Sequence, residues 1–258
     1  MKSLPSLDLG HGVDGVSVIV PTLDEVDNLR ILLPTLRRMP GVCEVIVVDG
    51  GSEDGTVPVA EHFGFKVLCT NEPNRGAQLH AGALASRGAA LWFVHADTVV
   101  PEEAADLILR LLDEPGIAGG NFSLRFGKGS EADRFWTGFY AQAGRLGLRY
   151  GDSACFARRE AYAAAGGFRD FPLFEDLDLH KRLRRQGRFV TLPFFVETSA
   201  RRYAGRPAPL VLLELATLQI GFWLGVPPKK LARWYQRAKR TRSTSKAQPS
   251  RARSLPER

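Results

Sequence analysis

The sequence has 258 residues, enough for one large domain or two small ones. Hydrophobic residues make up 44% and charged residues 24%, which is typical of globular proteins and excludes a mostly disordered chain. The three cysteines, Cys43, Cys69 and Cys155, have no C-x-x-C spacing, which excludes a disulfide scaffold and a cysteine zinc site and favours a reducing compartment. The first residues contain no apolar run of signal-peptide length, so we expect a cytoplasmic protein.

The net charge of +7 is concentrated near the C-terminus. Residues 229–258 hold 11 Lys and Arg side chains against one acidic residue, whereas residues 1–228 hold 24 basic and 27 acidic ones. The basic character therefore belongs to a tail, and the body of the protein gives little support for nucleic-acid binding. We expect no nucleic-acid partner.

The first hundred residues alternate apolar runs with helical patterns. Continuous apolar runs of four or five residues are typical of strands buried on both faces of a parallel sheet. Strands that alternate with helices at this spacing indicate βαβ units and an α/β fold. The four runs are Val16–Val20, Glu44–Val48, Phe65–Leu68 and Leu91–Val94.

The stretches between these runs carry helix start signals. Thr22–Glu25 has the pattern of a capping box before a leucine-rich helical face. Ser52 is placed to cap the helix that carries Val57 and Val59, and Pro101 opens a later helix.

The second half of the chain is less regular. The patterns there predict short strands interspersed with helices rather than repeated βαβ units. We expect strands over Gly119–Phe126, Ser153–Ala157, Phe189–Leu192 and Phe195–Glu197, the last two flanking Pro193, and helices over Arg134–Leu146, after Ala157 and over Asp176–Gln186.

Leu210–Val226 is mostly apolar but is interrupted by Glu214, Thr217 and Gln219. A membrane-spanning helix needs about 20 predominantly apolar residues, so a span is the least favoured interpretation. We favour an amphipathic helix packed on the domain. The alternative is a helix on a membrane surface, followed by the cationic tail, with peripheral membrane contact through residues 210–258 at the inner face of the membrane.

These patterns divide the chain into four parts. We expect a flexible N-terminus over residues 1–14, one α/β domain over 15–205 and a helical extension over 206–240. Residues 241–258 lack apolar periodicity, which predicts a disordered basic tail.

Polar residues follow three of the predicted parallel strands. Pro21–Glu25 follows the first, Asp49–Ser52 the second and His95–Asp97 the fourth. Ligands of an open parallel sheet bind at the carboxyl ends of its strands, where these segments would meet. Their carboxylates can hold a hard divalent cation or accept hydrogen bonds from a ligand. Asp97 could equally be a turn residue or a helix cap.

A second acidic cluster lies at Glu175, Asp176 and Asp178. Asp176 falls at the start of a predicted helix, where the helix dipole stabilises a carboxylate, so an ordinary first-turn acid is an alternative to a catalytic one. Upstream, Gly167 allows close backbone approach, and Phe168 offers an aromatic face either for packing or for stacking on a sugar.

Five segments in register resemble the family-2 glycosyltransferases over about residues 16–203. They are VSVIVPTLDEVDNL, VIVVDGGSEDGT, NRGAQLHAGA, WFVHADT, and GGF followed by FEDLDLHKRL. The HADT form and the FARRE, GGF and TSARRY segments resemble a narrower subgroup, the arsenosugar-biosynthesis-type glycosyltransferases.

The resemblance implies a GT-A fold, that is, a Rossmann-like mixed sheet flanked by helices. It also implies an inverting glycosyltransferase (EC 2.4) with a divalent metal, Mn²⁺ or Mg²⁺, a nucleotide-diphosphate sugar donor, UDP-linked by preference, and a hydroxyl acceptor of unknown identity. The implied nucleotide-binding residues are Pro21, Thr22, Glu25, Asp49, Gly51, Arg75, Gly76, Gln78 and Ala96.

The same resemblance assigns the catalytic and metal positions. Asp176 matches the general base, with Glu175 as the neighbour that shapes the acceptor side, and Asp97 and His95 match the metal-binding motif. Asp152, Gly167 and Phe168 fall on the acceptor side, and Arg201 and Arg202 could assist at the diphosphate or be surface arginines.

Three positions depart from the family pattern. Gly50 stands where a second aspartate is usual, His95 replaces the first acid of the metal motif, and His80 stands where an asparagine is common. Imidazole is a softer ligand than carboxylate, which favours either Mn²⁺ over Mg²⁺ or a metal held through fewer protein atoms.

Two rival functions differ in class. A sugar-1-phosphate nucleotidyltransferase would need a Gly-rich loop with Arg and Lys after the first strand, and Pro21–Asp24 has neither. A non-catalytic nucleotide-binding protein or membrane adaptor on the same fold would use the cationic tail and be indifferent to loss of Asp176.

Overall fold

The computed structural model describes residues 7–10, 12–127, 129–147, 153–199, 203 and 205–236. It has strands β1 (Val13–Thr22), β2 (Val42–Asp49), β3 (Lys66–Cys69), β4 (Gly88–Phe93), β5 (Ile117–Phe126), β6 (Phe156–Arg158) and β7 (Arg188–Thr198). Its helices are α1 (Val26–Arg38), α2 (Thr56–His62), α3 (Arg75–Leu84), α4 (Ala104–Asp113), α5 (Glu131–Arg145), α6 (Arg159–Ala164), α7 (Glu175–Leu183) and α8 (Ala208–Trp223).

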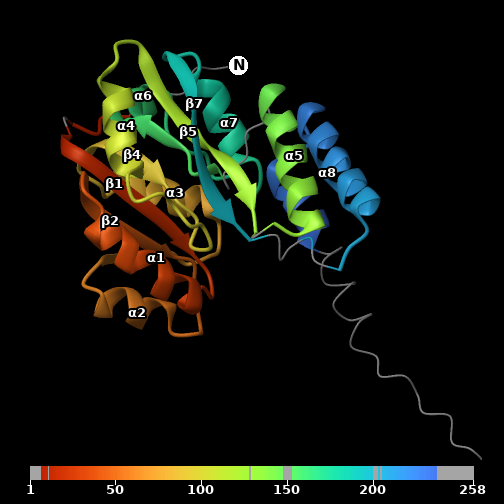
Figure 1. Cartoon of the computed structure of the whole chain (residues 1–258), viewed down its shortest axis with the longest axis horizontal. Helices are drawn as coiled ribbons and strands as arrows, with labels where there is room; N and C mark the ends of the chain where they lie inside the picture. The colour runs from red at the N-terminus through yellow and green to blue at the C-terminus, as the bar shows by residue number, and fades with distance from the viewer. Residues whose placement is uncertain are drawn as a thin grey trace, which may run out of the picture.

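The strands form one mixed seven-stranded sheet with helices on both faces (Figure 1). The strand order is β3-β2-β1-β4-β6-β5-β7. This arrangement confirms the expected α/β class with a mixed sheet flanked by helices.

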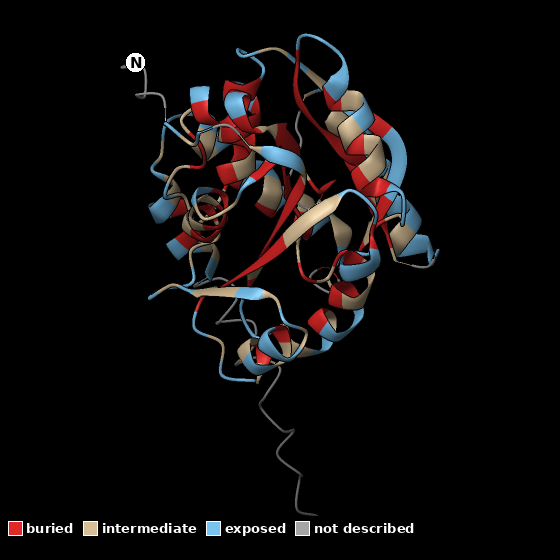
Figure 2. Cartoon of the chain, turned by 90° about the vertical axis from the view of Figure 1, so that its left-hand side faces the viewer, coloured by how far each residue is buried: buried red, intermediate tan, exposed pale blue. Residues whose placement is uncertain are grey.

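The four strands predicted in the first half are present and parallel. β1 pairs with β2 on one side and with β4 on the other, and β2 pairs with β3. Val18 and Ile19 are adjacent in β1 and both fully buried, because their side chains enter separate hydrophobic clusters on opposite faces of the sheet. Figure 2 shows the buried residues running through the sheet between the helices.

The second half adds the strands that make the sheet mixed. β6 is antiparallel to β4 and β5, and β7 is parallel to β5. β7 is one strand where the sequence predicts two. Its pairing with β5 passes from Leu192 directly to Phe195, because Pro193 has no N–H to donate and is accommodated with Phe194 in a bulge.

Two predicted helix caps are wrong. Thr22 ends β1, and Glu25 occupies the N-cap of α1 without a side-chain cap bond. α2 begins after Gly55, whose φ of +91° suits glycine, and not after Ser52. The backbone N–H groups of residues 24, 25 and 26 instead donate to the side chains of Ser52, Thr56 and Asp54. The start of α1 is thus capped by side chains of the loop after β2. A capping motif of four consecutive residues cannot predict such a contact between two separate loops.

The C-terminal helix α8 lies beside α5 at one end of the sheet (Figure 1). The two helices meet in an aromatic cluster in which Trp136 stacks on Tyr203 at 4.2 Å between ring centroids, with Val211 of α8 packed against them. Residues 228–236 form a further helical segment, and its Leu231 packs with Leu218 and Phe174. Within the described part of the chain, no helix combines the length and apolarity that a membrane span needs. The proposed domain boundaries stay predictions.

Candidate functional site

Asp49 is the centre of a hydrogen-bonded loop at the carboxyl end of β2. Its carboxylate is 2% exposed and accepts hydrogen bonds from the hydroxyls of Thr22 and Ser52 and from the backbone N–H groups of Gly51 and Ser52. Burial opposes ionisation of Asp49, but these hydrogen bonds outweigh it and lower its pKa. The site therefore holds a permanent negative charge where the ends of β1 and β2 meet.

Gln78 ties α3 to the same edge. Its side-chain amide donates to the carbonyl oxygens of Thr22 and Val48, at 2.9 and 2.8 Å, so it occupies backbone acceptors at the ends of β1 and β2. A Cβ at Gly50 would lie 3.1 Å from the Gln78 amide nitrogen and from Pro73. This close approach gives a physical reason for glycine where the family pattern has a second aspartate.

α3 also packs closely on the loop that precedes α7. A Cβ at Gly76 would lie 2.4 Å from the carbonyl oxygen of Arg169 and 2.7 Å from that of Phe171. Asn74 caps α3 by accepting a hydrogen bond from the N–H of Ala77, and its amide also bonds to Asp170. Only glycine at position 76 permits this contact without a shift of either segment.

Arg75, at the first position of α3, connects the two acidic clusters. Its Nε lies 2.6 Å from a carboxylate oxygen of Glu175, which is 1% exposed, whereas the Arg75 side chain is 35% exposed. The negative charges of Glu175, Asp176 and Asp97 together outweigh burial and raise the pKa of Arg75. The fold therefore brings Asp97, after β4, and Asp176, in α7, into electrostatic reach of one guanidinium.

Asp176 is held at the start of α7 by a strained turn. Phe174 precedes the helix with φ of +65°, a left-handed conformation that is unusual for a bulky residue, and its ring packs against Phe222 of α8 at 4.8 Å. The carboxylate of Asp176 accepts a hydrogen bond from the N–H of Leu177 at 2.7 Å. Burial, reinforced by the charge of Asp176, raises the pKa of the Cys155 thiol to about 12, so Cys155 is a neutral neighbour of the cluster.

Three non-glycine residues of the described segments adopt a left-handed backbone conformation. In the described segments, Asp24, Ala154 and Phe174 are the non-glycine residues with positive φ. Asp24 follows β1, Ala154 precedes Cys155, and Phe174 precedes Glu175. Such conformations persist where surrounding contacts determine them, and they are enriched at functional sites.

His95 and Asp97 lie in the turn after β4, and both are partly exposed. Ala96 between them is 5% exposed, and the turn is closed by a hydrogen bond from the N–H of Thr98 to the carbonyl oxygen of His95. No three His, Cys, Asp or Glu side chains are grouped closely enough for a metal ion within the described ranges. His95 and Asp97 together could offer a metal ion two side-chain ligands, one imidazole nitrogen and one carboxylate.

Gly167 and Phe168 have clear packing roles. A Cβ at Gly167, where φ is +62°, would lie 2.6 Å from the ring of His80. Phe168 is 5% exposed, and its ring packs edge-on against Phe93 at 4.8 Å and against Tyr162. The structure shows Phe168 packed between these rings, and its place on the acceptor side stays a prediction.

The remaining predicted residues fall into two groups. Pro21 and Thr22 are the last residues of β1, Glu25 is the N-cap of α1, and Gly51 is exposed beside Asp49. Asp152, Arg201 and Arg202 lie outside the described residues. The roles assigned to all these residues, and to Arg75, Gly76 and Gln78, stay predictions.

The sequence did not reveal three contributors to this site. Asp54 accepts hydrogen bonds that join the loops after β1 and β2, Asp170 joins α3 to the loop before α7, and Cys155 lies near Asp176. Asp54 and Asp170 resemble any surface acid in sequence, and Cys155 has no motif. The sequence predicts only an acceptor-side role for Glu175. Its ion pair with Arg75 joins residues 100 positions apart, and no local sequence pattern predicts such a contact.

Comparison with known proteins identifies the family. The family model described as Glycosyl transferase family 2 matches residues 17–164, more than half of the chain, and the protein therefore belongs to this family. Glycosyltransferase AglE of Haloferax volcanii is 29% identical over 135 residues, which are 48% of this chain and 44% of AglE. The chain thus matches less than half the length of that relative.

Solved structures show the same fold. Glucosyl-3-phosphoglycerate synthase from Mycobacterium tuberculosis, in complex with Mn²⁺, UDP and phosphoglyceric acid, aligns with a TM-score of 0.60 and 20% identity over 83% of this chain and 80% of that one. TarS from S. aureus, in complex with UDP-GlcNAc, aligns with a TM-score of 0.59 and 18% identity over 72% of this chain and 59% of that one. The mixed sheet and these neighbours confirm the expected GT-A fold of glycosyltransferases.

Proposed function

We propose that the protein is an inverting, metal-dependent glycosyltransferase that moves a sugar from a UDP-linked donor to an acceptor hydroxyl. The observation that carries the proposal is the ion pair of Arg75 with the buried Glu175. It sets the start of α7, which carries Asp176, against the start of α3, at the edge of the sheet where Asp49 ends β2 and Asp97 follows β4. Such an edge is where ligands of open α/β sheets bind. The UDP complexes of the two structural neighbours support the choice of donor.

Asp176 is the proposed general base. A carboxylate at this position can accept the proton of an acceptor hydroxyl that lies within hydrogen-bond reach, which makes the oxygen a better nucleophile. Attack from the side opposite the departing diphosphate gives inversion at the anomeric carbon. The N–H of Leu177 and the first turn of α7 stabilise the carboxylate in its charged form.

Glu175 and Arg75 position the reacting groups. The buried carboxylate of Glu175 neutralises Arg75 and fixes the start of α7 against the start of α3. The remaining N–H groups of the guanidinium are suited to phosphate oxygens, since guanidinium presents several donors in a fixed plane. Asp49 and its loop would hold the nucleoside, because a charged carboxylate accepts hydrogen bonds from N–H and O–H groups of a ligand.

A divalent metal fits the donor set of His95 and Asp97. Mg²⁺ and related ions are commonly held by one or two protein side chains together with substrate phosphates, so two neighbouring ligands suffice. The metal would be held by Asp97 with His95, and it would supply charge neutralisation at the leaving diphosphate. The imidazole of His95 favours Mn²⁺, the ion present in the synthase complex.

The finer assignments rest on the sequence. The cytoplasmic location stays a prediction from the sequence. The acceptor is a hydroxyl compound of unknown identity, and membership of the arsenosugar-biosynthesis-type subgroup stays a prediction.

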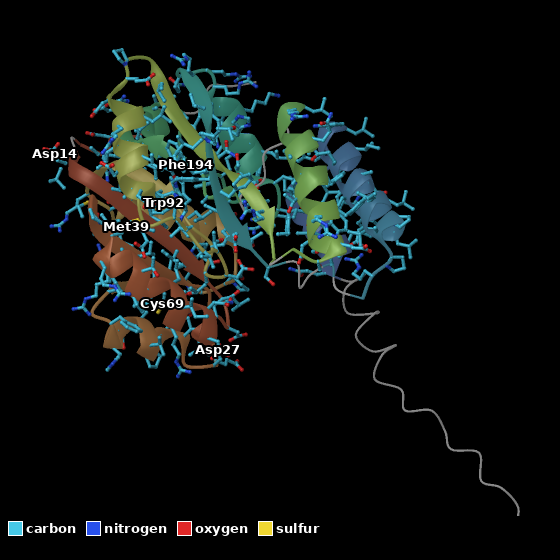
Figure 3. The ribbon with its side chains drawn as sticks, in the orientation of Figure 1. Asp14, Asp27, Met39, Cys69, Trp92 and Phe194 are labelled. Carbon is cyan, nitrogen blue, oxygen red and sulfur yellow. The ribbon has the colours of Figure 1, made fainter. Side chains whose placement is uncertain are left out.

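Calorimetric titration of UDP, with GDP in parallel and with and without Mn²⁺, tests the donor site. UDP is expected to bind wild-type protein only with Mn²⁺, and Asp97→Asn should lose this metal dependence and most of the affinity. Asp176→Asn should bind UDP normally and lose transfer from UDP-sugars. Asp27→Asn is the matched control, because Asp27 is a surface carboxylate of α1 that is 89% exposed (Figure 3).

Two outcomes would overturn the proposal. Absence of binding by either nucleotide in the presence of Mn²⁺ would show that the Gly50 and His95 departures have disabled the site, and a non-catalytic role would replace it. Full transfer activity in Asp176→Asn would remove Asp176 from the mechanism.

A further inference from the structure

Helix α8 buries two of its three polar side chains and exposes several of its large apolar ones. Glu214 and Gln219, two of its three polar side chains, are 7% and 5% exposed. The exposed fractions of Leu210, Leu213 and Trp223 are 60%, 65% and 64%. We define the outer stripe as Leu210, Leu213, Thr217, Ile220, Trp223 and Leu224, which recur at intervals of three or four residues and so share one side of the helix.

The expected amphipathic helix would turn its polar side to water, and α8 does not. α8 does pack on the domain, through Val211, Leu218 and neighbouring residues. The only charged residue of α8, Glu214, is turned inward, where Arg206 pairs with it. A helix that faces water places its charges outward, because burying a carboxylate costs free energy even when it is paired. The outer stripe is therefore suited to an apolar environment.

Basic residues follow the outer stripe in the sequence, and one of them, Lys229, pairs with Asp170. Lys229, Lys230 and Arg233 of the following helical segment are exposed, and so is Trp234, at 46%. The sequence from 229 to 258 has 11 basic residues and one acidic residue. An occupant of this face must therefore offer apolar contact and negative charge together.

We propose that the outer stripe, together with the basic residues Lys229, Lys230 and Arg233 that follow it, binds the surface of an anionic lipid bilayer. The boundary between headgroups and acyl chains accepts Leu, Ile and Trp side chains, while anionic headgroups attract Lys and Arg. A second copy of this chain is a poorer occupant, because it would bring a second segment of the same positive charge against the first.

The proposed surface is close to the catalytic loop. Phe222 lies on α8 one residue before Trp223 of the outer stripe, and its ring contacts Phe174, two residues before Asp176. One helix, about 10 Å across, would thus separate the bilayer from the turn that holds the proposed base. In Figure 1, α8 lies at the outer edge of the folded body, away from β1 and β2.

Co-sedimentation of the full-length protein with lipid vesicles tests the inference. We expect binding to vesicles of phosphatidylglycerol and phosphatidylcholine at low salt, and at least tenfold weaker binding to phosphatidylcholine alone. Leu213→Glu with Leu224→Glu should lower the partition coefficient by about tenfold or more, since each leucine loses its insertion. Ile31→Glu on α1, where Ile31 is 67% exposed, is the matched control and should bind like wild type.

Circular dichroism of each variant establishes that it is folded before sedimentation is compared. Failure of wild-type protein to sediment with anionic vesicles would overturn the inference, as would equal binding by the double variant. Sedimentation velocity of the protein without lipid tests whether a second copy of the chain covers the outer stripe instead. A wild-type dimer together with a monomeric double variant would assign the stripe to self-association and overturn the inference. None of these results depends on glycosyl transfer.

Discussion

Arg75 is the residue on which the geometry of the candidate site depends most directly. It pairs with Glu175, and it lies within electrostatic reach of Asp97 and Asp176. Sequence motifs identified all four residues individually. They could not identify the Arg75–Glu175 pair, because that contact depends on how α3 docks against the loop before α7.

Loss of Arg75 should destabilise the fold by leaving a buried carboxylate without its cation. We expect Arg75→Met to lower the free energy of unfolding by about 2 kcal/mol, less than for a fully buried pair because Arg75 is partly exposed. Adding Glu175→Gln should restore at least half of the loss, as urea unfolding of the single and double variants would show. Additive losses would contradict the coupling.

Asp49 should contribute stability that depends on pH. Its pKa is lower in the folded protein than the ordinary value of 3.8, so its stabilisation is present above that value and is lost as the pH falls through the folded pKa. Asp49→Asn should cost about 2 kcal/mol at pH 7, and its difference from wild type should narrow below pH 4. Urea unfolding between pH 3 and 7 measures this difference, and a gap that stays constant with pH would argue against it.

At the scale of elements, the close packing of α3 against the loop before α7 depends on Gly76, which has no Cβ. Gly76→Ala would place a Cβ against two carbonyl oxygens, so we expect a loss of about 2 kcal/mol and weaker UDP binding. Gly138→Ala in α5 is the control, because nothing lies within 4 Å of its Cβ, and it should gain about 0.5–1 kcal/mol. Thermal unfolding compares the two variants, and equal effects would show that the contact is not restrictive.

The regular elements could be predicted because their signals are local. The runs that became β1 to β4 are short and mostly apolar, those of β1 and β2 are rich in β-branched residues, and the resemblance supplied their order in the fold. The bulge at Pro193 and Phe194 and the exchange of caps between loops could not be predicted, since each depends on a partner segment. The side of α8 that faces water was wrongly predicted for the same reason. Glu214 and Gln219 are polar in sequence, but they are buried because Arg206 pairs with Glu214 and the domain covers both residues.

For the whole molecule, the C-terminal helices are part of the folded body. Phe174, Trp136 and Tyr203 are buried in clusters to which α8 contributes. A chain that ends at residue 206 should therefore expose these aromatic residues and aggregate. A chain that ends at residue 240 keeps Leu231 and Tyr235 and should unfold at the same temperature as the full chain. Size-exclusion chromatography and thermal unfolding distinguish the two, and a monomeric, cooperatively folded 1–206 chain would contradict this expectation.

The unequal environments of the cysteines have a practical consequence for fluorescence work. Cys69 ends β3 beside Asp49, to which it is paired in register, and its side chain is exposed (Figure 3). The Cys155 thiol is kept protonated by burial and by Asp176, so maleimide reagents, which attack thiolates, should leave it unmodified at neutral pH. On the proposed role of Asp49 in holding the nucleoside, a dye attached to Cys69 would report binding of the nucleotide in real time.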